Sequence, residues 1–208
     1  MSRLILIGSG GHALSVADTL ARTGVRPDGC INEVNDLALP GVPLLGRSLE
    51  DVPDVRDCRF FIAFGDNENR RRWFETLRGL DLPLVNIIDP TALVSDSAVL
   101  GCGVFVGKYA VINAGAVIGD DTIVNTRAIV EHECRVGSHV HLSTGSILNG
   151  KAVAEDLVFF GSSAVCNDKV HIGREAVVGS GSVVIRDIPP AVTAVGNPAR
   201  IIKSRQGL

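Results

Sequence analysis

Hydrophobic positions recur every six residues in the second half of the chain. Counting from Val94 to Val184 in steps of six gives sixteen positions, and thirteen of them hold Val, Ile or Leu. A small or β-branched residue usually stands two places earlier, and Gly, Asn, Ser or Glu usually follows directly after. Because side chains alternate faces along a strand, each unit predicts a short strand with one inward apolar side chain, followed by a corner.

This spacing predicts a β-solenoid that begins near residue 92 and ends after Asp187, where a proline-rich tail leaves the repeat. Three units close a triangular coil of eighteen residues, and about five coils stack at roughly the ordinary strand spacing of ~4.8 Å. We expect Gly and Asn directly after the inward residues to supply the positive φ of the corners. Cys134 and Cys166 fall at inward positions and are interpreted as small core residues.

A different pattern occupies the first ninety residues. Short apolar runs at 3–8, 29–32 and 59–65 alternate with helical patterns, the second of which we expect Asn67 to cap. Alternating strands and helices predict a small parallel sheet with helices packed on it. The expected fold is therefore an α/β N-terminal domain with a small Rossmann-like sheet, residues 1–89, followed by an all-β parallel β-helix, residues 90–208.

Composition and charge narrow the classes of function. A net charge of −3 gives no basic surface for DNA or RNA, and an aromatic content of 4% gives few platforms for base stacking. The apolar run at the N-terminus is too short for a signal peptide, and no stretch approaches the roughly 18 apolar residues of a membrane span. Five cysteines without a C-x-x-C pair fit a reduced compartment. We expect a soluble cytoplasmic protein.

A glycine-rich turn joins the first expected strand to the first expected helix. Gly8, Gly10 and Ala13 match the relaxed dinucleotide fingerprint, and Glu33 follows Ala13 by twenty residues. A complete NAD fold has two mononucleotide halves, and ninety residues suit only one. We therefore expect a single nucleotide diphosphate, its phosphates at the start of the helix. Alternatively, the small residues only permit tight packing of strand against helix.

The segment 129–141, IVEHECRVGSHVH, gathers three histidines, two glutamates and a cysteine. The repeat places His132 and Glu133 at a corner, and alternation predicts that His139 and His141 point outward on one face, about 7 Å apart. His132 and His141 are separated by half a coil, so they cannot readily share a metal within one subunit. A solvated corner remains an alternative for His132 and is the favoured interpretation of His139.

Four motifs around the repeat carry a resemblance to a known family: GSGGH, FIAFGDNENR, NTRAIVEHE and VGNPARIIK. In this order they resemble one bacterial family of hexapeptide-repeat sugar acyltransferases. It includes N-acetyltransferases of nucleotide-linked 4-amino-4,6-dideoxy sugars (bacillosamine and perosamine types) and sialic acid O-acetyltransferase relatives. The resemblance implies a left-handed β-helix, a homotrimer with active sites between subunits, and acetyl-CoA as the acyl donor without a metal. Asn32-Glu33 departs from the family's frequent Asp-Asp and leaves the nucleotide base open, and Asp89 stands where the family commonly has His.

The resemblance also implies the roles of individual residues. His132 acts as the general base and Glu133 orients it, which requires corner geometry because neighbours on a strand point opposite ways. His141 and the backbone N–H of Gly150 face the thioester, the latter as an oxyanion donor. Further contacts with acetyl-CoA are expected from Gly161, Ser162, Gly179, Ser180 and Pro198. Contacts with the sugar nucleotide are expected from Ser9, Gly10, Gly11, His12, Asn32, Glu33, Asp66, Asn67, Arg70 and Asn125. For Asn125 a purely structural role at a corner is at least as well supported. For Gly161 and Gly179, the repeat itself also explains why glycine stands there.

The expected function is acetyl-CoA-dependent N-acetylation of a nucleotide-linked amino sugar by direct transfer, for surface polysaccharide or glycoprotein synthesis. O-acetylation of a sialic acid or a similar sugar by the same residues is the nearest alternative. A zinc hydrolyase of the γ-carbonic anhydrase type would need three ligands converging between subunits. A solenoid that only binds and assembles is a third alternative.

Overall fold

The computed structural model describes residues 2–34 and 38–204. Contacts between residues divide it into two units, Met1–Pro90 and Thr91–Leu208. Among the described residues, no helix has the length and the apolar character needed to cross a membrane.

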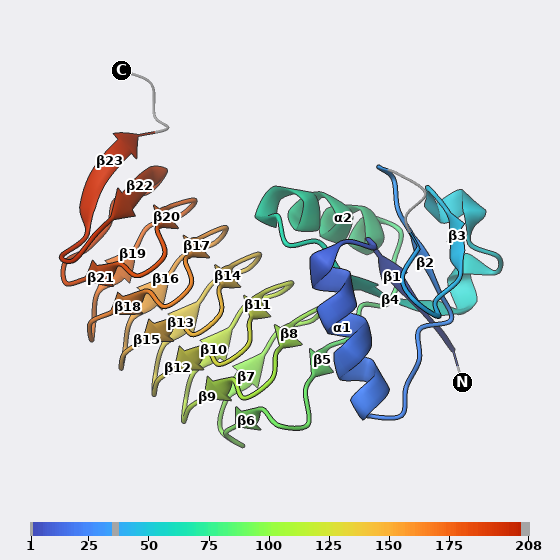
Figure 1. Ribbon diagram of the computed structural model, residues 1–208, viewed down its shortest axis with the longest axis horizontal. Helices are drawn as coiled ribbons and strands as arrows, with labels where there is room; N and C mark the ends of the chain where they lie inside the picture. The colour runs from blue at the N-terminus through green and yellow to red at the C-terminus, as the bar shows by residue number, and fades with distance from the viewer. Residues whose placement is uncertain (1, 35–37, 205–208) are drawn as a thin grey trace. The chain divides into compact units, whose positions relative to one another are not determined.

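The first unit contains the expected small parallel sheet (Figure 1). Its strand order is β3-β2-β1-β4, and the strands are β1 (Arg3–Ile7), β2 (Gly29–Ile31), β3 (Leu44–Gly46) and β4 (Cys58–Ile62). Helix α1 (Gly11–Arg22) follows β1 and helix α2 (Asn67–Gly79) follows β4, while β5 (Ile87–Ile88) ends the unit. Strand β3 and the short 3-10 turns at Leu49–Asp51 and Val55–Asp57 were not expected.

The order of these strands determines where loops from different parts of the sequence meet. Strands β1 and β4 are parallel neighbours, with Ile7 beside Ile62, and β2 lies on the other side of β1. The loops that follow β1, β2 and β4 therefore leave the sheet at one edge. In open parallel sheets this carboxyl edge is where ligands bind.

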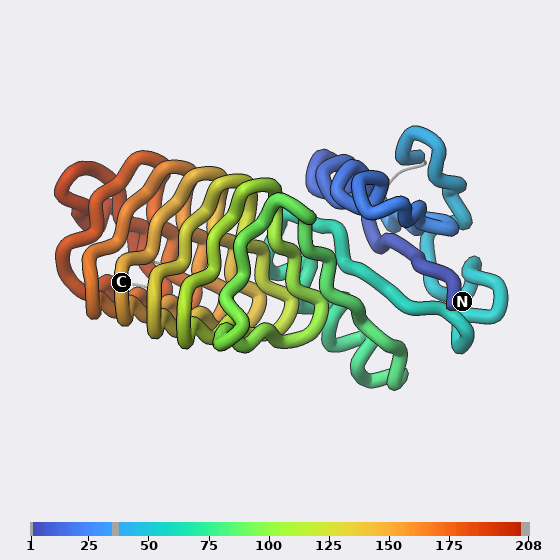
Figure 2. Tube along the Cα trace, turned by 90° about the horizontal axis from the view of Figure 1, so that it is seen from below, coloured from blue at the N-terminus to red at the C-terminus, as the bar shows by residue number. Residues whose placement is uncertain are grey.

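The second unit is a left-handed parallel β-helix of two-residue strands, stacked coil upon coil (Figure 2). One face carries β6 (Leu93–Val94), β9 (Val111–Ile112), β12 (Ile129–Val130), β15 (Ile147–Leu148), β18 (Val165–Cys166) and β21 (Val183–Val184). The next carries β7 (Val99–Leu100), β10 (Val117–Ile118), β13 (Arg135–Val136), β16 (Val153–Ala154) and β19 (His171–Ile172). The third carries β8 (Phe105–Val106), β11 (Ile123–Val124), β14 (His141–Leu142), β17 (Phe159–Phe160) and β20 (Val177–Val178).

The register of these strands confirms the predicted coil. Ile118 pairs with Val136, and Val130 with Leu148, so each strand lies beside the strand eighteen residues further on. The sixteen positions of the hexapeptide pattern are the second residues of β6 to β21, and all except Val94 and Leu100 in the first coil are buried. Together with the small residues two places earlier, they form one continuous core.

The expected reason for the corner glycines is wrong. Positive φ occurs three places after the inward residue, as at Glu133 (φ 59°) and Lys151 (φ 62°), and not directly after it. The glycines directly after the inward residues are required by stacking instead. A β-carbon on Gly137 would lie 2.6 Å from the backbone nitrogen of Asp156 in the next coil.

The tail leaves the hexapeptide repeat as expected, but it forms a hairpin that the sequence pattern did not indicate. Strand β22 (Val192–Val195) pairs in parallel with β20, and β23 (Arg200–Ser204) returns antiparallel to β22. The hairpin thus extends the third face of the β-helix by two strands (Figure 1).

Candidate functional site

The turn after β1 forms an open start to helix α1. Gly8 has φ 107°, and a β-carbon there would lie 3.2 Å from the Ala63 carbonyl oxygen, so this position requires glycine. Gly10 is the N-cap and offers no capping side chain, while β-carbons on Gly10 or Gly11 would meet no atom within 4 Å. The first turn therefore presents backbone N–H groups to open space, with partly exposed His12 beside them. Such a helix start suits a phosphate.

Ser9 and Asn32 connect the loops after β1 and β2. The Asn32 side-chain amide donates to Ser9 Oγ at 2.6 Å, and Asn32 Oδ1 accepts from the Val34 N–H at 3.1 Å. Both side chains are buried. These contacts fix the shape of the turn, and the expected contact of both residues with the substrate stays a prediction.

Glu33, the expected ribose ligand, forms an ion pair with Arg72 of α2. Arg72 was not identified from the sequence, because its pairing with a residue 39 positions away depends on how α2 packs on the sheet. The adjacent Arg71 pairs within its own helix, with Glu68 and Glu75. Only one arginine of this pair thus contacts the loop after β2.

The loop after β4 is held by its own side chains. Asp66, and not Asn67 as expected, caps α2, since its Oδ1 accepts from the Asn69 N–H at 2.9 Å. Arg70, which we expect to help close the substrate site, is 1% exposed. Its guanidinium donates to the Gly65 carbonyl at 3.1 Å and to Asn67 Oδ1 at 3.0 Å. Arg70 therefore positions the loop from beneath.

In the second unit, His132 and Glu133 form a corner between β12 and β13. The positive φ of Glu133 turns two adjacent side chains toward each other, which a strand would not do. His132 Nδ1 lies 3.1 Å from Glu133 Oε2, and both side chains are more than half exposed. A carboxylate at Nδ1 fixes the ring and leaves Nε2 to act on a proton.

Gly150 lies beneath the ring of His132, one coil further on. A β-carbon on Gly150 would lie 2.6 Å from His132 Nε2, so only glycine leaves the ring in this place. Among the described residues, the Gly150 N–H has no hydrogen-bond partner. The same is true of the N–H of Ala114, which lies in the same corner column, the set of equivalent corner positions eighteen residues apart. At Gly150 this free donor lies beside a histidine.

His141 lies on β14 and is largely buried. Asn125 Oδ1 accepts from the Thr126 N–H at 2.8 Å, so its Nδ2 faces His141 Nε2 at 3.3 Å. An amide nitrogen only donates, and Nε2 therefore accepts. Phe159 of the next coil packs edge-on against the imidazole, with ring centroids 5.2 Å apart. The structure thus brings together Asn125 and His141, two residues that were expected in different roles.

Strand alternation predicted that His139 and His141 share an outward face, and this prediction is wrong. His139 lies in the turn before β14 with φ 60°, and its side chain is only 11% exposed. Its Nδ1 contacts Asp121 Oδ2 at 2.8 Å. The favoured interpretation of a solvated corner residue is therefore wrong, because this histidine is buried against a carboxylate of the preceding coil.

The expected acetyl-CoA contacts lie on the later coils. A β-carbon on Gly161 would lie 2.5 Å from the Ser180 nitrogen, and one on Gly179 would lie 2.6 Å from Val195 Cγ1, so stacking explains both glycines. Ser162 and Ser180 are exposed beside them. Pro198 is exposed in the turn between β22 and β23.

The cysteines at inward positions are core residues, as predicted. Cys134 and Cys166 are free and buried, and burial raises the pKa of Cys134 to about 11 and that of Cys166 to about 12. Over the described ranges, no three His, Cys, Asp or Glu side chains are grouped so that they could hold a metal ion.

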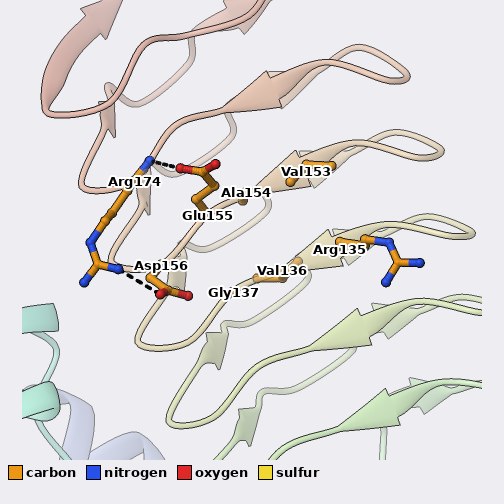
Figure 3. Close-up of a pocket in the computed structure, with 8 residues that line it drawn as sticks. All are labelled: Arg135, Val136, Gly137, Val153, Ala154, Glu155, Asp156 and Arg174. Atoms are coloured by element: carbon orange, nitrogen blue, oxygen red, sulfur yellow. Dashed lines mark hydrogen bonds and ion pairs between the residues drawn. The ribbon is translucent and has the colours of Figure 1, made fainter.

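A hollow on the β13–β16 face contains neither His132 nor His141 (Figure 3). Glu155 accepts from the Arg174 N–H at 2.7 Å and lies 2.7 Å from His171 Nε2, and these contacts lower the pKa of its carboxyl, the backbone bond most. Arg174 Nη1 lies 3.0 Å from Asp156 Oδ2. Arg174 is therefore engaged with both Glu155 and Asp156 and ties successive corners together. Its lining residues are Arg135, Val136, Gly137, Val153, Ala154, Glu155, Asp156 and Arg174.

Comparison with known sequences gives matches to both units. Residues 3–77 match the family model of the PglD N-terminal domain. GDP-perosamine N-acetyltransferase of Escherichia coli O157:H7 is 31% identical over 150 residues, which cover 69% of this chain and 67% of that protein.

Two solved structures resemble the chain over nearly its whole length. A variant of perosamine N-acetyltransferase from Caulobacter crescentus, in complex with CoA and GDP-perosamine, has a TM-score of 0.92 and 38% identity, covering 97% of each chain. The acetyltransferase domain of PglB from Neisseria gonorrhoeae has a TM-score of 0.93 and 33% identity, covering 97% of this chain and 100% of that domain.

Proposed function

Because this chain belongs to the hexapeptide-repeat N-acetyltransferases of nucleotide-linked amino sugars, we propose that it transfers an acetyl group from acetyl-CoA to such a sugar. The acceptor is the amine of a nucleotide-linked 4-amino-4,6-dideoxy sugar. The observation that carries the proposal is the contact of His132 with Glu133 directly above the free amide of Gly150. One corner of the β-helix thus combines a base, its orienting carboxylate and an oxyanion donor.

The chemistry follows from these three groups. The sugar amine attacks the thioester carbonyl, and His132 Nε2 accepts the proton that the amine loses as the C–N bond forms. Glu133 accepts a hydrogen bond from Nδ1 and stabilises the ring while it is charged. The Gly150 N–H stabilises the carbonyl oxygen as it becomes negative. The C–S bond then breaks, and the thiolate of CoA takes up the proton that His132 held.

The first unit is proposed to hold the nucleotide diphosphate. The open start of α1 at Gly10 and Gly11 supports this, because it offers backbone donors and a favourable helix dipole to phosphates. Ser9 and Asn32 shape the loop, and the Glu33–Arg72 pair is proposed to contact the ribose or the base. His12 and Asp66 lie at the starts of the two helices that follow β1 and β4.

The second unit is proposed to bind acetyl-CoA along its later coils and to assemble into a cytoplasmic homotrimer. Exposed Ser162 and Ser180 beside glycine corners, and exposed Pro198, fit contact with an extended cosubstrate. His141, held by Asn125, would face the thioester from the neighbouring subunit. The product would serve surface polysaccharide or glycoprotein synthesis.

Steady-state kinetics with acetyl-CoA and a panel of acceptors tests this function. We expect acetylation of at least one GDP-, UDP- or dTDP-linked 4-amino sugar, and a fall in kcat of at least about 10²-fold for His132→Ala. His171→Ala is the matched control, because His171 is also exposed and paired with a glutamate but lies on another face. Faster acetylation of free sialic acid would favour the O-acetyltransferase alternative. Unchanged activity in His132→Ala would refute the proposed base.

A further inference from the structure

Lys151 occupies the same corner of the β-helix as Glu133, one coil further on. The two residues are eighteen positions apart, and both have the left-handed backbone of this corner, with φ 62° and 59°. The Lys151 N–H donates to the His132 carbonyl at 2.9 Å, which fixes the two coils against each other here. Side chains at equal positions of stacked coils point the same way, so Lys151 extends beside the catalytic pair.

The Lys151 ammonium contacts the carboxylate that orients the base. Its Nζ lies 3.5 Å from Glu133 Oε2, the same oxygen that lies 3.1 Å from His132 Nδ1. These two contacts, the hydrogen bond with His132 first, hold the pKa of the Glu133 carboxyl below its usual range. Glu133 Oε2 is therefore shared between a ring nitrogen and an ammonium group.

We propose that Lys151 is a positioning residue for the acetyl transfer. It holds the Glu133 carboxylate where that group accepts the His132 Nδ1–H, and its charge offsets the negative charge beside the imidazole. Glu133 then orients the ring so that Nε2 faces away from the carboxylate and can accept the amine proton. This inference rests on the proposed function and adds a residue to its machinery.

The other charged groups around this corner have different partners or none. Glu131 accepts from the Asn113 amide at 2.8 Å. Arg135, on β13, has no ion pair among the described residues, and neither have Asp168 and Lys169 of the next coil. Lys151 is thus the cation that meets Glu133. The side chains of His132, Glu133 and Lys151 are each about half exposed, and exposed ion pairs add little to folding stability. We therefore expect Lys151 to affect the rate of acetyl transfer and not the stability of the fold.

The test compares Lys151→Met, Lys151→Arg and Lys169→Met in pH profiles of kcat/KM with acetyl-CoA and GDP-perosamine. Lys169 is the matched control, since it has the same corner backbone (φ 61°) one coil beyond Lys151. In Lys151→Met we expect kcat to fall about 3- to 10-fold. The acidic limb of its kcat/KM profile should move to higher pH, because the Glu133 carboxylate, no longer paired with an ammonium group, retains the proton on the His132 ring. Lys151→Arg should restore both properties, and Lys169→Met should leave both unchanged.

A double-mutant cycle shows whether Lys151 acts through Glu133. In a Glu133→Gln background, Lys151→Met should have no further effect on kcat or on the acidic limb. An equal fall in both backgrounds would overturn the proposal, and so would a change confined to the KM of acetyl-CoA. NMR of the His132 ring without substrate gives an independent readout, in which Lys151→Met should raise the fraction protonated at Nδ1, because the uncompensated carboxylate retains that proton. An unchanged fraction would also overturn it, and this result stands even if no acetyl transfer is found.

Discussion

At the scale of single residues, the site depends on backbone conformation as much as on side-chain identity. The sequence identified His132 and Glu133, yet strand alternation would have pointed them apart, and only the left-handed corner at Glu133 brings them together. Lys151 was open to prediction, because the eighteen-residue register places it beside Glu133. Arg72 was not, since its contact with Glu33 follows from the packing of α2 and from no period in the sequence.

Gly150 supplies a prediction at this scale. In Gly150→Ala, the new β-carbon would lie 2.6 Å from His132 Nε2, too close for the ring to stay, and the exposed ring would swing away at little cost to folding. We expect kcat to fall at least about tenfold, because misplacing a catalytic group by about 1 Å can cost 10²-fold. Thermal stability should hardly change. Steady-state kinetics and a thermal melt measure the two effects.

Ala114 provides the control for that substitution. It occupies the same corner column two coils earlier, which shows that this backbone accepts a β-carbon where no histidine lies above it. Ala114→Gly should leave kcat unchanged. Full activity in Gly150→Ala would mean that His132 works from another position than the one seen here.

At the scale of elements, hydrophobic period predicted the β-helix well because each inward side chain is buried between its neighbours in the stack. The period carries no information on backbone conformation, so it led to the wrong explanation of the corner glycines, which are required by close stacking and not by positive φ. Strand β3 and the β22–β23 hairpin were missed for a related reason. They are short segments outside the repeat, and they become strands only because an existing edge offers backbone partners.

The stacking role of the corner glycines predicts a difference between two substitutions. A β-carbon on Gly119 would lie 2.5 Å from the carbonyl carbon of Gly137, and backbone cannot move aside as a side chain can. Gly119→Ala should therefore lower the free energy of unfolding by about 1–3 kcal/mol. Gly181 has φ 68° and open space where a β-carbon would lie, and asparagine tolerates positive φ. Gly181→Asn should therefore change the free energy of unfolding little. Denaturant unfolding at one protein concentration measures both, and equal stabilities would contradict the stacking argument.

At the scale of the whole molecule, the outward side of the β6–β21 face points to assembly. Its strands begin with Leu93, Val111, Ile129, Ile147, Val165 and Val183, so this face is aliphatic on its outer side as well as its inner side. An outward face on a solvated solenoid would alternate with polar residues. A continuous apolar strip of this kind marks an interaction surface, and it supports the proposed homotrimer.

Mixed trimers test whether His132 and His141 of different subunits form one active site. His132→Ala and His141→Ala should each be nearly inactive as homotrimers. In a cyclic trimer the same two surfaces meet at every interface, so random mixing of the two variants restores an intact pair at about one quarter of the sites. We therefore expect co-expressed variants to recover about a quarter of wild-type kcat. If the mixed trimers form, as differently tagged subunits would reveal, and stay inactive, both histidines act within one subunit. A stable, active monomer would contradict the shared site altogether, because a lone β-helix has His132 at the β12–β13 corner and His141 on another face.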